Sequence, residues 1–285
     1  MKICRFEDQQ GQAGIGLVES FSTLVNLAPA GIRQLELLLE ADDPAARVNE
    51  ALHAELPRIP VSEVRLCAPV EQQEVWAAGV TYLRSKAARM EESHFSATAY
   101  DHVYSAERPE LFFKSLGPKV AGPGQPVGIR RDARWSVPEP ELALVINSRG
   151  GIVGYTIGND MSSRDIEGEN LLYLPQAKIY DRSCALGPWV VLGVPEAEVR
   201  AWKLGLSIQR GAEAVFTGET TVGRMKRGFE ELTGFLFRSQ SLPHGAVLLT
   251  GTGIVPPDQF TLQERDVVEI EISGIGRLRN EVVLV

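Results

Sequence analysis

The 285-residue sequence has few of the residues that build zinc and redox sites. Its three cysteines, Cys4, Cys67 and Cys184, lie far apart and form no CxxC pair, which argues against a zinc or thioredoxin-like site. An odd number of cysteines fits a reducing compartment, and the N-terminus has no apolar signal-peptide core. We therefore expect a cytoplasmic protein.

The sequence also lacks an excess of positive charge and any long apolar run. Its formal net charge is -8 at pH 7, whereas a nucleic-acid-binding face is usually basic. No apolar run reaches the ~18 residues of a membrane span, so we expect neither nucleic acid nor a membrane as a partner. An anionic substrate stays compatible with this charge, because a bound metal reverses the local field of an acidic pocket.

Glycine-rich nucleotide motifs are absent as well, since no G-x-G-x-x-G opens a helix. Many short apolar or alternating segments and few helical ones predict a mostly β protein with some α structure (α+β). We expect a small N-terminal domain, residues 1–65, with a hairpin at its start and a linker at 56–60, and a larger domain, residues 66–285. The other predicted strands are 75–80, 111–114, 140–146, 151–157, 189–192, 204–209, 246–250, 267–272 and 278–284. The predicted helical segments are 32–52, with a break at 42–44, 82–92 and 228–239.

Two glutamates, Glu139 and Glu141, stand at the start of an apolar strand. Residues two apart in a strand point to the same face, so these carboxylates project together. Neighbouring carboxylates repel each other, and ligation of a hard cation is one reason to keep them side by side. The alternative is a solvated strand end with two exposed acids, and the spacing alone favours this simpler interpretation.

A third carboxylate, Asp160, ends the next predicted strand. Three carboxylates with no nearby histidine or cysteine suit magnesium, manganese or calcium rather than zinc. The same polar segment contains Arg164 and Asp165. We expect these two residues to be structural, capping a turn and pairing with each other.

Two further segments contain candidate binding residues. Lys178 follows a proline in an otherwise uncharged stretch, although a lone lysine is usually solvated. Thr252 lies between Gly251 and Gly253 after a predicted strand, where hydroxyl and backbone N–H groups can face an anion. A plain turn is the alternative at Thr252.

Taken in order, these segments resemble the fumarylacetoacetate hydrolase superfamily over residues 72–285. The segments that carry the resemblance are 79–82, 112–114, 139–141, 154–156, 159–165, 176–178, 186–188 and 249–252. The resemblance implies a mixed β-sheet roll or barrel as the catalytic domain, residues 66–285, and a homodimer or homotetramer. It also implies that Glu139, Glu141 and Asp160 bind a divalent metal, Mg²⁺ or alternatively Mn²⁺, with Lys178 beside the metal and the substrate.

One departure from the superfamily pattern bears on the reaction. Its hydrolases place a histidine shortly after a tyrosine, in an N-Y-x-x-H pattern. Here Thr81 stands at the asparagine position and Ser85 at the histidine position. A serine hydroxyl does not replace an imidazole as a base near neutral pH, so this departure argues against C–C bond hydrolysis.

A narrower branch, the 2-keto-3-deoxy-pentonate dehydratases, resembles residues 107–114, 137–143 and 169–180. This branch includes 2-keto-3-deoxy-D-arabinonate dehydratase. The resemblance implies a hydro-lyase of pentose catabolism that makes 2,5-dioxopentanoate from the arabinonate or xylonate derivative. Lys178 and Glu110 are the expected acid–base pair, in either order. Tyr82, Ser85 and Thr252 are expected to position the substrate. A surface glutamate is the alternative for Glu110, and ordinary packing is the alternative for Tyr82 and Thr252.

Two other functions stay open. The first is a hydrolase or decarboxylase of 2,4-dioxo acids such as fumarylacetoacetate or acylpyruvates, which Ser85 argues against. The second is a non-catalytic protein that binds metal and sugar acids. The complete set of metal-binding carboxylates, together with Lys178 and Thr252, argues against the second.

Overall fold

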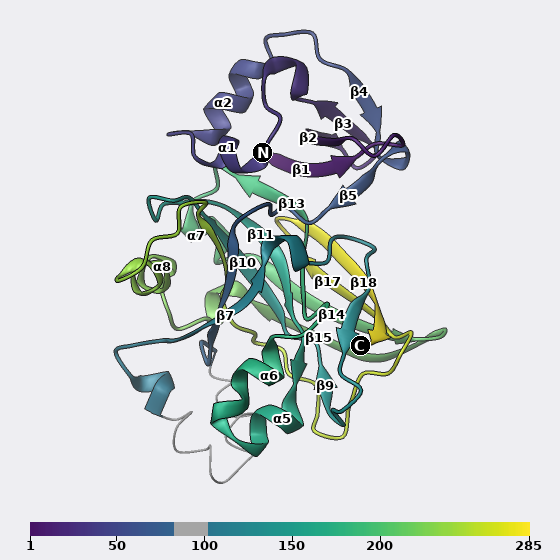
Figure 1. Ribbon diagram of the computed structural model, residues 1–285, viewed down its shortest axis with the longest axis vertical. Coiled ribbons are helices and arrows are strands. Elements are labelled where there is room, and N and C mark those ends of the chain that lie inside the picture. The colour runs from purple at the N-terminus through teal and green to yellow at the C-terminus, as the bar shows by residue number, and fades with distance from the viewer. Residues whose placement is uncertain (83–101) are drawn as a thin grey trace.

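The computed structural model describes residues 1–82 and 102–285 of the chain. Strands dominate this part and form mixed sheets, which confirms the prediction of a mostly β protein. The N-terminal strands and the first two helices lie at one end of the molecule, and helices α5 and α6 lie at the other (Figure 1).

The N-terminal residues form antiparallel strands with two short helices beside them. These elements are β1 (Lys2–Glu7), β2 (Ala13–Ser20), β3 (Thr23–Asn26), β4 (Arg58–Pro60), β5 (Arg65–Cys67), α1 (Leu35–Leu39) and α2 (Pro44–Ala51). The predicted hairpin of β1 and β2 turns near Gly11, whose φ of 78° suits glycine. Asp43 caps α2 by accepting a hydrogen bond of 2.9 Å from the backbone of Ala46. The predicted linker at 56–60 contains β4, which pairs with β3.

The N-terminal strands continue the central sheet. β1 pairs with β13 (Cys184–Leu192), and Ile3 lies opposite Val190. Apolar side chains of α1, α2 and the first strands pack into a buried cluster that also includes Val190 and Leu192. The division into domains near residue 65 stays a prediction.

The centre of this sheet is buried. After β13 it continues with β11 (Ile152–Asp160), β10 (Pro140–Ile146), β16 (Ala246–Leu249), β6 (Glu74–Gly79) and β7 (Glu110–Leu116). These neighbours are antiparallel except for β16 and β6, which are parallel. β10 is buried along its whole length, which explains the unbroken apolar run that follows Glu141.

A five-stranded sheet, a two-stranded sheet of β9 and β12, and four α-helices make up the other strands and α-helices that lie wholly within the described residues. They are β8 (Val127–Ile129), β9 (Ser136–Val137), β12 (Ser162–Ser163), β14 (Lys203–Arg210), β15 (Glu213–Thr221), β17 (Val267–Ile272), β18 (Gly276–Leu284), α5 (Arg164–Glu169), α6 (Leu174–Lys178), α7 (Glu196–Val199) and α8 (Phe229–Phe237). The five-stranded sheet has the order β15-β14-β17-β18-β8. β15 was not predicted, because this largely exposed edge strand has no apolar face to signal it.

Two predictions fall outside the described residues. These are Ser85 and, apart from Tyr82, the helix at 82–92. Within residues 1–82 and 102–285, no helix is long and apolar enough to cross a membrane.

The three cysteines should differ in reactivity. Cys4 and Cys184 are buried, and burial raises the pKa of each thiol to about 12, whereas Cys67 is partly exposed. Because the thiolate is the reacting species, we expect an alkylating reagent to modify Cys67 in the native protein well before the other two. Peptide mapping after timed alkylation measures the order, and equal labelling of Cys4 and Cys67 would contradict it.

Candidate metal centre and active site

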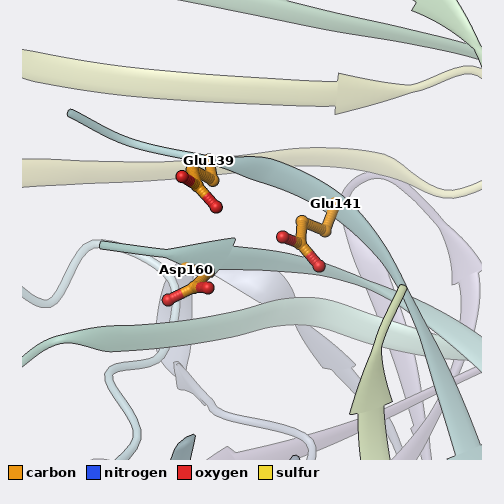
Figure 2. Close-up of side chains that lie close together, drawn as sticks. All are labelled: Glu139, Glu141 and Asp160. Atoms are coloured by element: carbon orange, nitrogen blue, oxygen red, sulfur yellow. The ribbon is translucent and has the colours of Figure 1, made fainter. Parts of the chain in front are cut away.

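The register of two neighbouring strands brings three carboxylates together. Glu141 of β10 lies opposite Gly158 of β11. Beyond this ladder, the backbones of Glu139 and Asp160 exchange two hydrogen bonds, of 3.2 and 3.0 Å. Because Glu139 and Glu141 are two residues apart, their side chains share a face, and all three carboxylates meet at the ends of the strands (Figure 2).

The three carboxylates fit a divalent cation. Each residue is at most 4% exposed, and a carboxylate oxygen of each lies within 4.8 Å of the others. Hard cations such as Mg²⁺ and Mn²⁺ prefer oxygen ligands of this kind. Burial excludes the alternative of a solvated strand end for Glu139 and Glu141.

Glu141 experiences the repulsion within this cluster. Its Oε2 accepts a hydrogen bond of 2.6 Å from the backbone N–H of Gly251. Burial, and then the charges of Asp160 and Glu139, nevertheless raise the pKa of Glu141 well above its usual range. A cation bound among the three carboxylates would offset this repulsion.

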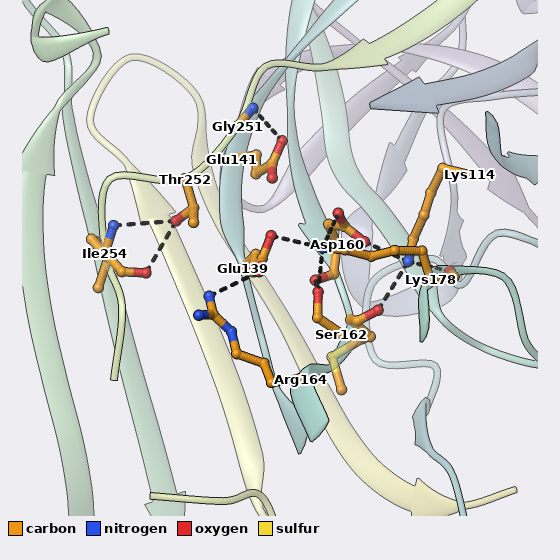
Figure 3. A network of polar contacts seen from close by, with 11 residues as sticks. Lys114, Glu139, Glu141, Asp160, Ser162, Arg164, Lys178, Gly251, Thr252 and Ile254 are labelled. Atoms are coloured by element: carbon orange, nitrogen blue, oxygen red, sulfur yellow. Dashed lines mark hydrogen bonds and ion pairs between the residues drawn. The ribbon is translucent and has the colours of Figure 1, made fainter. Parts of the chain in front are cut away.

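Lys178 meets the cluster from the end of α6. Its ammonium donates hydrogen bonds to Glu139 Oε2 (3.0 Å), Asp160 Oδ2 (2.9 Å) and Ser162 Oγ (2.6 Å) (Figure 3). These contacts occupy all three donors of the ammonium. Lys178 is 1% exposed, which excludes the alternative of a solvated lysine.

A second buried lysine, Lys114 of β7, supports the cluster from behind. Its ammonium lies 2.5 Å from Asp160 Oδ1 and donates to the backbone oxygens of Met161 (2.9 Å) and Lys178 (2.5 Å). Lys114 therefore links β7 to the end of β11 and to α6, and it fixes both the Asp160 side chain and the Lys178 backbone. In the sequence, Lys114 is recognisable only as part of a family motif, residues 112–114.

Arg164 and Asp165 have different partners from those expected. Arg164 is buried, and its Nη2 donates a hydrogen bond of 3.0 Å to Glu139 Oε1. Asp165 Oδ2 accepts one of 2.6 Å from the backbone N–H of Arg134. Arg164 therefore belongs to the carboxylate cluster, and its pairing with Asp165 was the wrong expectation.

Glu110 and Thr252 line the same cavity as the three carboxylates and Lys178. Glu110 is the first residue of β7. The Thr252 hydroxyl donates a hydrogen bond of 3.1 Å to the Ile254 carbonyl and accepts one of 3.2 Å from the Ile254 N–H. Both residues are placed where the predicted roles need them, and the roles themselves stay predictions.

Tyr82 lies next to this cavity rather than in its described lining. Its buried ring packs on Gly253, where a Cβ would come within 2.6 Å of the ring. A role in positioning the substrate stays a prediction for Tyr82, as it does for Ser85 outside the described residues.

Sequence reasoning missed one more acid in the cavity. Glu167 of α5 is buried and contributes to the same lining. Its spacing of three residues from Arg164 could have indicated that Glu167 faces the carboxylate cluster, because residues three apart lie on the same side of a helix. The helix itself was not predicted, so the spacing could not be interpreted.

Comparison with known proteins identifies the family. Residues 74–283 match the family model described as fumarylacetoacetate (FAA) hydrolase C-terminal. This match covers more than half of the chain, and the chain therefore belongs to the fumarylacetoacetate hydrolase family.

Within this family the chain is similar to sugar-acid dehydratases. It is 48% identical over 217 residues to a probable 2-keto-3-deoxyxylonate dehydratase of Haloferax volcanii. It is 40% identical over 221 residues to 2-dehydro-3-deoxy-D-arabinonate dehydratase of Saccharolobus solfataricus, and each match covers 76% of this chain and 74% of the relative. A solved structure named as 2-keto-3-deoxy-D-arabinonate dehydratase complexed with magnesium and 2,5-dioxopentanoate matches with a TM-score of 0.84 and 33% identity, over 100% of this chain and 99% of that chain. The predicted resemblance to this family and to its dehydratases is confirmed.

Lys114 should be essential for stability. In Lys114→Met, Asp160 Oδ1 and two backbone carbonyls lose their buried cationic partner, so we expect the free energy of unfolding to fall by about 3–5 kcal/mol. Urea denaturation measures this change. The control is Lys119→Met, whose side chain is 68% exposed, with an expected change within about 0.5 kcal/mol. Equal stability of the two variants would contradict the structural role of Lys114.

Glu141→Gln should separate charge repulsion from metal binding. The pKa of Glu141 is higher in the folded protein than in the unfolded chain. The protonated carboxyl therefore adds to the free energy of unfolding at pH values below the unfolded-state pKa, and this contribution is lost as the pH rises through the folded-state pKa. Without metal, we therefore expect Glu141→Gln to gain stability relative to the unsubstituted protein as the pH rises from about 5 to 8. With Mg²⁺, we expect only the unsubstituted protein to be stabilised, by about 2.7 kcal/mol at 100 times the dissociation constant.

Thermal unfolding in EDTA and in Mg²⁺ across this pH range measures both effects. Glu281→Gln, which alters an exposed glutamate of β18, is the matched control. An undiminished Mg²⁺ shift in Glu141→Gln would rule out Glu141 as a ligand.

Proposed function

We propose that the chain is a metal-dependent hydro-lyase that converts a 2-keto-3-deoxy-pentonate, derived from arabinonate or xylonate, to 2,5-dioxopentanoate and water. One observation carries the proposal: a single cavity combines the three carboxylates with Lys178 and Glu110. The names of the relatives at 48% and 40% identity support it.

Mg²⁺ is the cation that we propose, with Mn²⁺ as the alternative. The oxygen-only donor set suits either ion, and the solved dehydratase at 33% identity is named as a complex with magnesium. Glu139, Glu141 and Asp160 would hold the ion. When bound, it supplies a Lewis acid toward the carboxylate and ketone oxygens of a 2-oxo acid.

We assign one proton transfer to Lys178 and the other to Glu110 from their positions in the cavity. Lys178 contacts two of the proposed metal ligands, so it is close to C3 when the C1–C2 end of the acid faces the carboxylates. Glu110 lies farther out, in the lining of both this cavity and an adjoining pocket, and therefore toward C4.

In the reaction, Lys178 as the neutral amine takes a proton from C3, and Glu110 as the neutral acid donates a proton to the C4 hydroxyl, which leaves as water. A C3–C4 double bond forms as the C3–H and C4–O bonds break. Tautomerisation then moves one proton from C5 to C3 and the C5 hydroxyl proton to C4, which gives the aldehyde at C5. The products are 2,5-dioxopentanoate and one molecule of water.

Hydrolysis or decarboxylation of 2,4-dioxo acids is the less supported function. Hydrolysis needs a base that activates water. Ser85 stands at the position of the hydrolase histidine, and the described lining of the cavity includes no histidine. A non-catalytic binding protein has no need of Lys178 and Glu110 beside the carboxylates.

The cellular setting and the assembly belong to the same proposal. We propose a cytoplasmic enzyme of pentose catabolism that forms a homodimer or homotetramer. Size-exclusion chromatography with light scattering would measure the assembly.

The direct test is turnover by the purified protein. We expect it to convert racemic 2-keto-3-deoxy-pentonate with Mg²⁺ to 2,5-dioxopentanoate, detected through a coupled NADP-dependent dehydrogenase, and to lose this activity in EDTA. Lys178→Met should lower kcat by about two to four orders of magnitude, with Lys119→Met as the control. Pyruvate from an acylpyruvate, without turnover of the pentonate, would instead indicate a C–C hydrolase.

A further inference from the structure

Glu167 is a buried acid that the proton transfers described above do not use. It is 3% exposed, although most residues of the short helix α5 are only partly buried or exposed. Arg164 and Glu167 are the buried residues of this helix. Because they are three positions apart, they share the side that faces the carboxylate cluster, where Arg164 contacts Glu139.

Burying a carboxylate costs free energy unless its surroundings or its ligand compensate for the lost water. An apolar residue would fill the inner side of a helix at lower cost. Glu167 lines the cavity that also contains the three carboxylates and Lys178, and this position makes it a candidate for contact with a ligand.

The two cavities next to α5 indicate which part of a ligand Glu167 would meet. The inner cavity has the three carboxylates and Lys178 in its lining, and a pocket of about 410 Å³ adjoins it. Of the described residues, Glu110 and Glu167 line both cavities. The rest of the described outer lining is apolar except for Arg108, and consists of Val103, Pro109, Leu111, Leu171 and Leu174.

A 2-keto-3-deoxy-pentonate has its hydroxyl groups at the end that points away from the metal. With C1 and C2 at the carboxylate cluster, the C4 and C5 hydroxyls extend toward the boundary between the two cavities. Glu110 is already assigned to the C4 hydroxyl as proton donor. The C5 hydroxyl remains, and an ionised carboxylate is an acceptor suited to a hydroxyl donor.

We infer that Glu167 contacts the substrate, accepts a hydrogen bond from the C5 hydroxyl and so selects for 2-oxo acids that carry this group. The inference rests on the proposed function, because it takes the pentonate as the substrate. It assigns Glu167 to specificity, whereas Lys178 and Glu110 move protons.

The experiment compares two substrates that differ only at C5. One is 2-keto-3-deoxy-pentonate, and the other is 4-hydroxy-2-oxopentanoate, which has a methyl group at C5 but can still lose water across C3 and C4. Consumption of each is followed by proton NMR with the full-length protein in Mg²⁺. We expect Glu167→Ala to lower kcat/KM for the pentonate by about 10- to 100-fold, the range for one hydrogen bond to a charged group.

For 4-hydroxy-2-oxopentanoate we expect Glu167→Ala to change kcat/KM by less than about threefold, because this substrate has no C5 hydroxyl to interact with Glu167. Glu167→Gln keeps one acceptor oxygen and should lose less than Glu167→Ala on the pentonate. Glu169→Gln, an exposed acid of the same helix, is the matched control and should leave both substrates unchanged.

The outcomes separate this inference from the proposed function. If the unsubstituted protein consumes neither substrate, the proposed function fails, and the inference fails with it. If that protein is active but Glu167→Ala affects both substrates equally, or neither, only the inference is overturned. Thermal unfolding with and without Mg²⁺ shows whether Glu167→Ala has a folding defect. If it has one, Glu167→Gln is used instead: a loss of kcat/KM on the pentonate alone supports the inference, and an equal effect on both substrates overturns it.

Discussion

The pairing of Glu139 with Asp160 across the ends of β10 and β11 is the contact on which the site depends. Two backbone hydrogen bonds place these carboxylates opposite each other, and the strand geometry then adds Glu141. A slip of one residue would turn Glu139 and Glu141 to the other face of the sheet. The buried side chains of β10 hold the register, so the geometry of the site follows from the packing of the core.

Buried charges connect this pair to the rest of the fold. Among the described residues, three cations reach the carboxylates from three other elements: Lys114 from β7, Arg164 from α5 and Lys178 from α6. Leaving one buried charge without its partner is costly. The positions of α5 and α6 against the sheet are therefore coupled to the arrangement of the carboxylates, and the helices and the site form together.

Local patterns predicted the parts of the site that lie within one strand or at its end. The two-residue spacing of Glu139 and Glu141 and the polar end of β11 were visible in the sequence, as was the strand-rich composition. The sequence pattern could not identify the partners of Lys114 and Arg164, because tertiary packing brings them to the carboxylates across 46 and 25 positions of the chain. Glu167 was missed for a related reason, since the short helix that orients it has no apolar periodicity of its own.

The pairing of β1 with β13 lets the first strand cover part of the edge of a buried strand. β13 is apolar and buried from end to end, and on the side that faces away from β11 its residues Val190 and Val191 pair with β1. A chain that began at residue 74, where the family match begins, would leave the β1-facing backbone groups at Val190 and Val191 without these partners. Such an edge is a template for pairing between chains. The first strand therefore covers part of an apolar strand edge of the central sheet, away from the carboxylates at the ends of β10 and β11.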